Sequence, residues 1–171
     1  MDEKKEKIEK KYGSFVNAGE INAKAAELLK AGDHEAIKEL AKETGIDEDD
    51  ALDYIEGEQE TFCNDLMAAL GKIKVESEEL DIFGPFEMWR DYIVEEINTD
   101  MVFFGSHVMD PGKTLVGAFA AVIKEEGEKR KPIDKKICKA AGIPENVQAS
   151  TLNKKQQVAV IRKYYIGKEI G

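Results

Sequence analysis

The sequence predicts a mainly α-helical protein with a compact fold of seven or eight helices and at most a minor β element. The helices could form one body or two small lobes. Three observations support this prediction. Apolar residues recur at helical spacing along most of the 171 residues. Glycines and helix-capping residues stand where these patterns start and stop. The sequence has no fixed-period repeat and no sustained heptad, which excludes a solenoid and a long coiled coil.

The N-terminal part of the chain divides into three helical segments. Residues 2–12 are rich in Lys and Glu and predict a short first helix. Residues 20–31 carry apolar side chains at helical spacing, and Gly32 follows where a helix would end. Asp33 is placed to cap a third helix, which would stop at Gly45. The second and third helices therefore form a hairpin.

Asp47 is placed to cap the next helix. The acidic residues 48–50 would lie in its first turn, where the helix macrodipole favours negative charge. Apolar residues then continue at helical spacing as far as Ile73, with Gly57 as the weak point. Both one long helix and two collinear helices fit this pattern.

The middle of the chain is rich in aromatic residues. Pro85 opens a helix in which Trp89 is expected to anchor the core. Core packing is also expected for four further aromatic residues: Phe83, Phe86, Phe103 and Phe104. Any of them that stays outside would be a natural anchor for a partner. Residues 101–109 fit a strand or a buried helix, and we favour the helix.

The C-terminal part predicts three more helices. Residues 115–123 form a strongly apolar helix, and residues 125–132 are expected to be an exposed linker. Residues 134–141 predict a short helix, and residues 152–166 the last one.

Charge is distributed unevenly along the chain. Residues 1–123 contain 13 basic and 29 acidic side chains, a net charge of -16, whereas residues 124–171 contain 12 basic and 6 acidic ones, a net charge of +6. We therefore expect an acidic helical body, residues 1–123, with a basic helical segment, residues 124–171, packed on it. The overall charge of -10 argues against a nucleic-acid binder that works through its net charge. The two parts could also dock on each other and cancel.

The densest acidic stretch is the candidate binding surface of the body. It comprises Asp47, Glu48, Asp49, Asp50, Asp53, Glu56, Glu58 and Glu60. An acidic surface steers a basic protein toward it, including one that normally holds nucleic acid. The alternative is a solvated helix surface without a partner.

The basic segment offers an alternative site, because the last helix carries a ridge of cations that could contact nucleic acid. They are Lys154, Lys155, Arg162 and Lys163. Residues 137–143 resemble the start of a helix-turn-helix, but ten residues then separate Ala141 from Leu152, where that motif has three or four.

Cysteine and histidine form no motif in the sequence. Cys63 and Cys138 lie 75 positions apart without the spacing of a zinc site, and we expect buried, reduced thiols. His34 and His107 have no partner nearby in sequence. An enzyme whose site assembles around one of these histidines in the fold stays open as a third class.

Two partial motifs fail on spacing. Residues 112–114 resemble the end of a phosphate-binding loop, but the required earlier glycine position holds His107. Asp47, Asp49, Asp53 and Glu58 imitate a calcium loop, but Leu52 occupies the position of its glycine. We expect a helix start there, and no cofactor or metal.

Residues 1–7 have mixed charges and no apolar core, unlike a secretory signal. The longest uncharged run, residues 114–123, has 10 residues, whereas a membrane-spanning helix needs about 20. We therefore expect a cytoplasmic protein.

The runs KKYG at residues 10–13 and NAGEINAKAAELL at residues 17–29 resemble the start of small proteins carried by phages and mobile elements of anaerobic gut bacteria. Small acidic proteins of such elements include anti-CRISPR proteins, which bind a nuclease effector or its guide complex. Together with the net charge of -16 over residues 1–123 and the absence of a catalytic motif, the resemblance leads us to expect a non-enzymatic inhibitor whose acidic surface binds a basic nucleic-acid-handling protein or nucleoprotein, such as a CRISPR effector. It transfers no functional residue.

Overall fold

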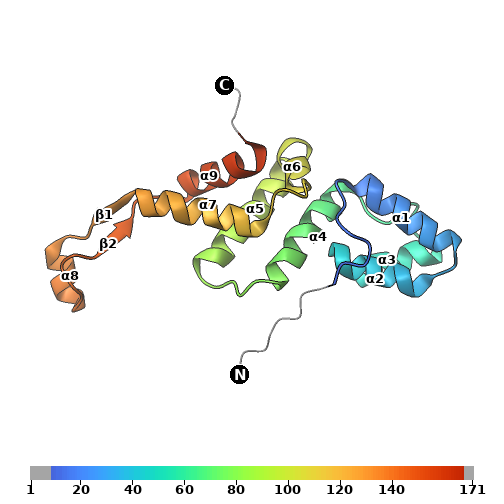
Figure 1. Cartoon of the computed structure of the whole chain (residues 1–171), viewed down its shortest axis with the longest axis horizontal. Coiled ribbons are helices and arrows are strands. Elements are labelled where there is room, and N and C mark those ends of the chain that lie inside the picture. Colours follow the sequence, from blue (N-terminus) through green and yellow to red (C-terminus); the bar gives the residue numbers. More distant parts are fainter. Residues whose placement is uncertain (1–8, 168–171) are drawn as a thin grey trace. The chain divides into compact units, whose positions relative to one another are not determined.

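The computed structural model of the chain describes residues 9–167 and is mainly α-helical, as predicted. These residues form nine α-helices, one π-helical turn and one sheet of two antiparallel strands, which is the minor β element. They belong to two compact units, the first reaching Leu115 and the second starting at Val116 (Figure 1). None of the helices in this part of the chain is long and apolar enough to cross a bilayer.

The first unit contains α1 (Ala18–Lys30), α2 (His34–Thr44), α3 (Glu48–Glu56), α4 (Asp65–Glu78), α5 (Pro85–Thr99), the π-helical turn η1 (Met101–Gly105) and α6 (Ser106–Val108). Side-chain caps begin three of these helices: Asn17 caps α1, Asp33 caps α2 and Asn64 caps α4. The helices share a core of fully buried side chains that includes Ile21, Ile37, Leu40, Phe62, Ile73, Ile93, Ile97 and Phe104.

The end of α2 lies directly against the middle of α4. Gly45 ends α2 in the left-handed conformation, with φ of 71°. A Cβ added to Gly71 on α4 would collide with the carbonyl oxygen of Thr44, and one added to Gly45 would collide with the backbone of Gly71. Two glycines therefore allow the two backbones to touch.

The predicted first helix is wrong where the structure describes it. Residues 9–12 are not helical, and residues 2–8 lie outside the described residues. The backbone N–H groups of Lys11 and Tyr12 donate to the carboxylate of Glu43, at 2.7 and 3.1 Å. The buried Glu43 thus takes the backbone donors that a helix at residues 2–12 would have used within itself.

The choice between one long helix and two after Asp47 is resolved at Gly57. This residue adopts φ of 81° and ends α3, because only glycine enters this left-handed region readily. The chain then turns through a loop before Asn64 caps α4.

The aromatic residues of the middle segment divide into buried and exposed ones. Trp89 and Phe104 are buried, as predicted, and the favoured helix at residues 101–109 is present as η1 and α6. Core packing was the wrong prediction for Phe83 and Phe103, which are 66% and 50% exposed. Phe83 precedes α5 on a loop and rests edge-on against the ring of Phe86.

The second unit contains most of α7 (Leu115–Glu128), then β1 (Arg130–Pro132), α8 (Lys135–Ala141), β2 (Gln148–Ser150) and α9 (Lys154–Ile166). Helices α7 and α9 contact each other within it. Gln157 donates to Glu126 at 2.9 Å, and a Cβ on Gly117 would collide with the ring of Tyr164. Ile161 and Tyr165 on α9 are buried.

The predicted linker at residues 125–132 is wrong. Helix α7 continues to Glu128, and β1 follows almost at once. β1 pairs antiparallel with β2, with Arg130 opposite Ser150 and Pro132 opposite Gln148. The pairing joins segments on either side of α8, so local sequence could not reveal it.

Candidate functional site

The eight acidic residues proposed from the sequence lie on α3, at its start and on the loop that follows it. Seven side chains are exposed, and that of Asp50 is partly buried. We call these eight residues, from Asp47 to Glu60, the acidic face. Lys74 of α4 pairs with Asp47 at 3.1 Å. As predicted, this stretch begins a helix.

The acidic face is held on a rigid frame. Asp49, Asp53 and Glu56 are separated by four and three residues, so they share one side of α3. The opposite side buries Ala51 and Tyr54. The ring of Tyr54 packs edge-on against that of Phe62, with 5.7 Å between centroids. The backbone that carries these carboxylates is therefore already ordered before a partner binds.

The loop after α3 is tied to the same frame. The side-chain amide of Gln59 donates to the backbone carbonyl of Asp50 at 2.8 Å. This bond holds the loop that carries Glu58 and Glu60 next to the first turn of α3.

The charges of α3 exceed what its helix requires. Acidic residues in the first turn suit the macrodipole, but Glu56 is the last residue of α3, where a negative charge is unfavourable. The pairs Asp49–Asp53 and Asp53–Glu56 place like charges on neighbouring turns, which costs about 0.2–0.5 kcal/mol each. The last turn contains no basic residue to offset them. Helix stability therefore does not account for the carboxylates in the second half of α3.

A second charged surface lies in the second unit. Residues 129–150, which we call the basic arm, comprise β1, α8 and β2 and extend from the end of α7 (Figure 1). The arm carries six exposed cations: Lys129, Arg130, Lys131, Lys135, Lys136 and Lys139. Its two acidic residues are Asp134, which caps α8, and Glu145.

The basic arm has little core of its own. Cys138 is its buried residue, whereas Ile137 beside it is 60% exposed. Lys135 lies 3.8 Å from Glu145, and Lys129 pairs with Glu125 of α7 at 2.8 Å. No ion pair within the described residues is found for Lys131 or Lys136.

The cations predicted on the last helix are on α9. Lys154, Lys155 and Lys163 are exposed, and Arg162 is partly buried. The structure adds the six cations of the basic arm, which our sequence analysis did not single out. Their signal was the clustering of six basic residues between positions 129 and 139.

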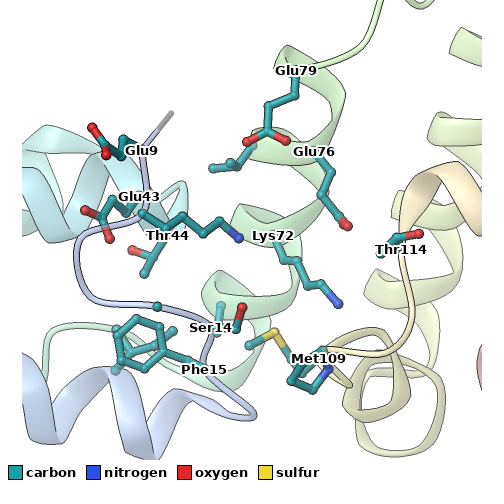
Figure 2. Close-up of a pocket in the computed structure, with 16 residues that line it drawn as sticks. Glu9, Ser14, Phe15, Glu43, Thr44, Lys72, Glu76, Glu79, Met109 and Thr114 are labelled. Atoms are coloured by element: carbon teal, nitrogen blue, oxygen red, sulfur yellow. The ribbon is translucent and has the colours of Figure 1, made fainter. Parts of the chain in front are cut away.

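A cavity of about 660 Å³ lies within the first unit (Figure 2). The N-terminal segment, α4, the ends of α1 and α2 and the loop after α6 line it, and its apolar lining includes Phe15, Ile21, Val75 and Met109. Its charged lining comprises Glu9, Lys10, Glu43, Lys72, Glu76 and Glu79. No residue of the acidic face lines this cavity. Its volume is within the range of about 300–1,000 Å³ of small-molecule sites.

Lys72 is committed to the backbone at one side of this cavity. Its Nζ donates to the carbonyl oxygens of Val108, Asp110 and Lys113, at 2.6, 2.8 and 2.7 Å. Three bonds use all the donors of a lysine ammonium. Burial lowers the pKa of Lys72, and the nearby carboxylate of Glu76 opposes this effect. Lys72 therefore fixes the loop that follows α6.

Glu76 follows Lys72 by one helical turn, and one oxygen of its carboxylate is left without a hydrogen bond in the part of the chain that the structure describes. Its Oε2 is buried and accepts no hydrogen bond from the described residues. Burial raises the pKa of Glu76, whereas Lys72, the backbone N–H of Leu115 and Lys10 act in the opposite direction. Neither Lys72 nor Glu76 was among the site residues predicted from the sequence. The available signal was a pair of charges at i and i+4 in the otherwise apolar stretch that became α4.

Cys and His side chains form no metal-binding cluster in the residues that the structure describes. No group of three or more His, Cys, Asp or Glu is placed to hold a metal ion there. Both cysteines are buried thiols, as predicted, and burial raises the pKa of Cys63 to about 11. His34 is exposed, and a ring nitrogen of His107 lies 2.7 Å from the carbonyl oxygen of Phe103.

Two charged surfaces and one cavity are therefore the candidate sites of this chain: the acidic face, the basic arm and the cavity beside Glu76. Neither histidine lines the cavity, so the third class of function, an enzyme built around His34 or His107, gains no support from it. No protein-family model, curated protein or solved structure that was compared with the chain matches it.

Proposed function

We propose that the chain is a non-enzymatic protein-binding module whose acidic face binds a basic, nucleic-acid-handling protein or nucleoprotein. The observation that carries the proposal is the display of all eight carboxylates on α3 and its flanks, seven of them exposed. Opposite charge speeds association and selects partners of the right sign. The proposed partner of most interest is a CRISPR effector, which would make the chain an inhibitor of the anti-CRISPR kind.

Two features of α3 support a binding role over a merely solvated helix. The carboxylates at Asp53 and Glu56 are placed where helix electrostatics disfavours them. The contact of Tyr54 with Phe62 and the bond from Gln59 hold the face in one arrangement before any partner arrives. A fixed and costly array of charge is typical of a surface that serves recognition.

The test is charge reversal on the exposed side of α3. The triple variant Asp49→Lys, Asp53→Lys, Glu56→Lys should bind a basic partner at least about tenfold more weakly than the unchanged chain. The control variant Glu87→Lys, Asp91→Lys, Glu95→Lys introduces the same change in charge on the exposed side of α5. Thermal unfolding of each variant checks that it is folded.

Binding is measured against purified CRISPR effectors with and without guide RNA, together with their cleavage of target DNA. The proposal expects binding and inhibition from the unchanged chain and from the α5 control, and their loss in the α3 variant. Equal binding by all three proteins would contradict a role for the acidic face. If no effector binds, the inhibitor class is wrong. The acidic-face proposal would then need another basic partner. The unchanged chain and the α5 control should capture this partner from a nuclease-treated lysate, and the α3 variant should not.

A second candidate function, binding of nucleic acid by the second unit, is favoured by the basic arm. Six exposed cations against two carboxylates on one arm, with four more cations on α9, complement a phosphate backbone. Anisotropy of labelled DNA duplex and single-stranded RNA measures it across a series of salt concentrations.

Neutralisation of the arm is the decisive comparison for this second candidate. The variant Lys131→Gln, Lys136→Gln, Lys139→Gln should lower the slope of log affinity against log salt by about 2–3, since each lost phosphate contact removes about 0.9. The variant Lys30→Gln, Lys42→Gln, Lys74→Gln removes as many exposed lysines from the first unit and should leave the slope unchanged. Absent or salt-insensitive binding would eliminate this candidate.

A further inference from the structure

The basic arm carries cations on both faces of its two-stranded ribbon. Successive residues of a strand point to opposite faces of the sheet, so Arg130 lies on one face of β1 and Lys131 on the other. The backbone N–H of Thr151 donates to the carbonyl oxygen of Lys129 at 3.2 Å, which continues the antiparallel pairing by one residue. Lys129 therefore belongs to the ribbon and shares the face of Lys131.

The strand opposite these cations does not neutralise them. Arg130 pairs with Ser150 and Lys131 with Ala149 across the ribbon, although an oppositely charged partner would stabilise such a pair. Both cations are exposed, and neither forms an ion pair with another residue between positions 9 and 167. Stability of the ribbon therefore does not account for these charges, which suit an anionic ligand on both faces.

Charge on both faces distinguishes between polyanions. A flat anionic surface, such as that of a membrane, contacts only one face of a ribbon. A groove of a nucleic acid duplex has a phosphate backbone on either side, and the major groove of B-DNA, about 12 Å wide, admits a two-stranded ribbon. The major groove of an RNA duplex is too deep and narrow for side chains to read. The ribbon thus matches a DNA duplex best.

Two further features of the arm agree with duplex DNA. Residues 129–150 contain no aromatic residue, whereas proteins hold single strands largely by stacking bases on aromatic side chains. Helix α8 forms the end of the arm (Figure 1), and its Ile137 is 60% exposed among lysines. Phosphate contact gives this side chain no role, but an apolar side chain in the major groove meets the methyl group of thymine.

We propose that the basic arm inserts into the major groove of duplex DNA, with Arg130 and Lys131 at the phosphates of opposite strands and Ile137 against a thymine methyl group. The proposal rests on the second candidate function, binding of nucleic acid by the second unit, and adds the form of the nucleic acid and the groove. It involves no residue of the acidic face.

The experiment measures anisotropy with the full chain and four labelled probes of one A·T-rich sequence. They are the DNA duplex, one of its single strands, the RNA duplex, and the DNA duplex with uracil in place of thymine. The DNA duplex should bind at least about tenfold more tightly than the single strand and the RNA duplex. Uracil lacks the methyl group in the major groove and should weaken binding about fourfold, the contribution of one buried methyl group.

Single substitutions test the two faces of the ribbon separately. Arg130→Gln and Lys131→Gln should each lower the slope of log affinity against log salt by about 0.9, because each removes one phosphate contact. Lys30→Gln, at an exposed position of α1, should leave the slope unchanged. Ile137→Ala should weaken binding of the thymine duplex alone, so that the thymine and uracil duplexes bind alike. Thermal unfolding checks that each variant is folded.

The results separate this proposal from the function on which it rests. If no probe binds, both are wrong, and sedimentation of the chain with phosphatidylcholine–phosphatidylserine vesicles would then assign the arm to a membrane surface. If the single strand or the RNA duplex binds as tightly as the DNA duplex, nucleic-acid binding stands and the duplex-DNA proposal is wrong. A slope that responds to only one of Arg130→Gln and Lys131→Gln would overturn insertion into a groove. Equal binding of the thymine and uracil duplexes by the unchanged chain would overturn the choice of the major groove.

Discussion

Lys72 and Glu76 stand one turn apart on α4 and meet their surroundings in opposite ways. The ammonium of Lys72 is fully hydrogen-bonded to the carbonyls of Val108, Asp110 and Lys113, so its burial is compensated. One oxygen of Glu76 is buried without such compensation. At the scale of single residues, Lys72 therefore stabilises the fold, whereas the burial of Glu76 costs stability.

The role of Lys72 predicts a large effect of Lys72→Met, which keeps the length of the side chain and removes the ammonium. The free energy of unfolding should fall by about 2 kcal/mol, because three charge-assisted hydrogen bonds are lost and part-buried carbonyls are left without a donor. Urea denaturation measures it. Lys74→Met, at an exposed position of α4, should change the value by less than about 0.5 kcal/mol. Equal effects of the two variants would contradict the assignment.

The raised pKa of Glu76 predicts a pH dependence of stability. A carboxyl group whose pKa is higher in the folded than in the unfolded chain contributes stability below the usual value near 4.5, and this contribution disappears as the pH rises through the folded-state pKa. The Glu76→Gln variant cannot ionise and keeps its stability. Between pH 4 and neutral pH, the free energy of unfolding of the variant should therefore rise relative to that of the unchanged chain. Urea denaturation at several pH values measures this difference. A constant difference across this range would show that Glu76 is not the titrating group.

At the scale of elements, α2 and α4 of the first unit meet backbone to backbone. The backbone of Gly71 meets that of Thr44 and Gly45, so that neither glycine has room for a Cβ. The same helix α2 packs against α3, which carries the acidic face, and α4 carries Lys72 and Glu76. One backbone contact thus fixes the elements that bear two of the candidate sites.

Gly71→Ala should therefore lower the free energy of unfolding by about 1–3 kcal/mol, because the added methyl group forces α2 and α4 apart. The matched substitution Gly127→Ala places a methyl group on α7, where no atom lies within 4 Å. It should raise stability by about 0.5–1 kcal/mol through helix propensity alone. Chemical denaturation of the two variants gives opposite signs if the close contact is real.

At the scale of the whole molecule, the charge separates between the two units. No charged residue lies between positions 114 and 123, so the residues up to Leu115 carry the net charge of -16 and those from Val116 carry +6. The net charge of -10 therefore describes neither unit. A polyanion that meets the molecule encounters the basic arm and α9 as a local surface.

This separation predicts that the chain is retained on immobilised heparin at low salt and neutral pH, although its isoelectric point is about 4.9. The Lys131→Gln, Lys136→Gln, Lys139→Gln variant should elute at lower salt. The first-unit variant Lys30→Gln, Lys42→Gln, Lys74→Gln should elute with the unchanged chain. Heparin chromatography measures all three, and passage of the unchanged chain without retention would contradict the local-surface argument.

The sequence by itself determined the helical class, most helix boundaries and the separation of charge. Asp33 and Gly45 bound α2, and Pro85 starts α5, because caps, turns and periodicity act through residues that are near each other in the chain. The exposed acidic face on α3 could be predicted for the same reason.

Only the tertiary structure decided the features that depend on distant residues. Glu43 takes the backbone donors of Lys11 and Tyr12 across more than 30 positions and so prevents the predicted first helix at residues 9–12. The strand pairing of residues 130–132 with 148–150, and the cavity beside Lys72 and Glu76, arise in the same way. In each case, residues far away in the sequence decide whether a buried polar group or a backbone group finds a hydrogen-bond partner. Local sequence patterns do not reveal these distant residues.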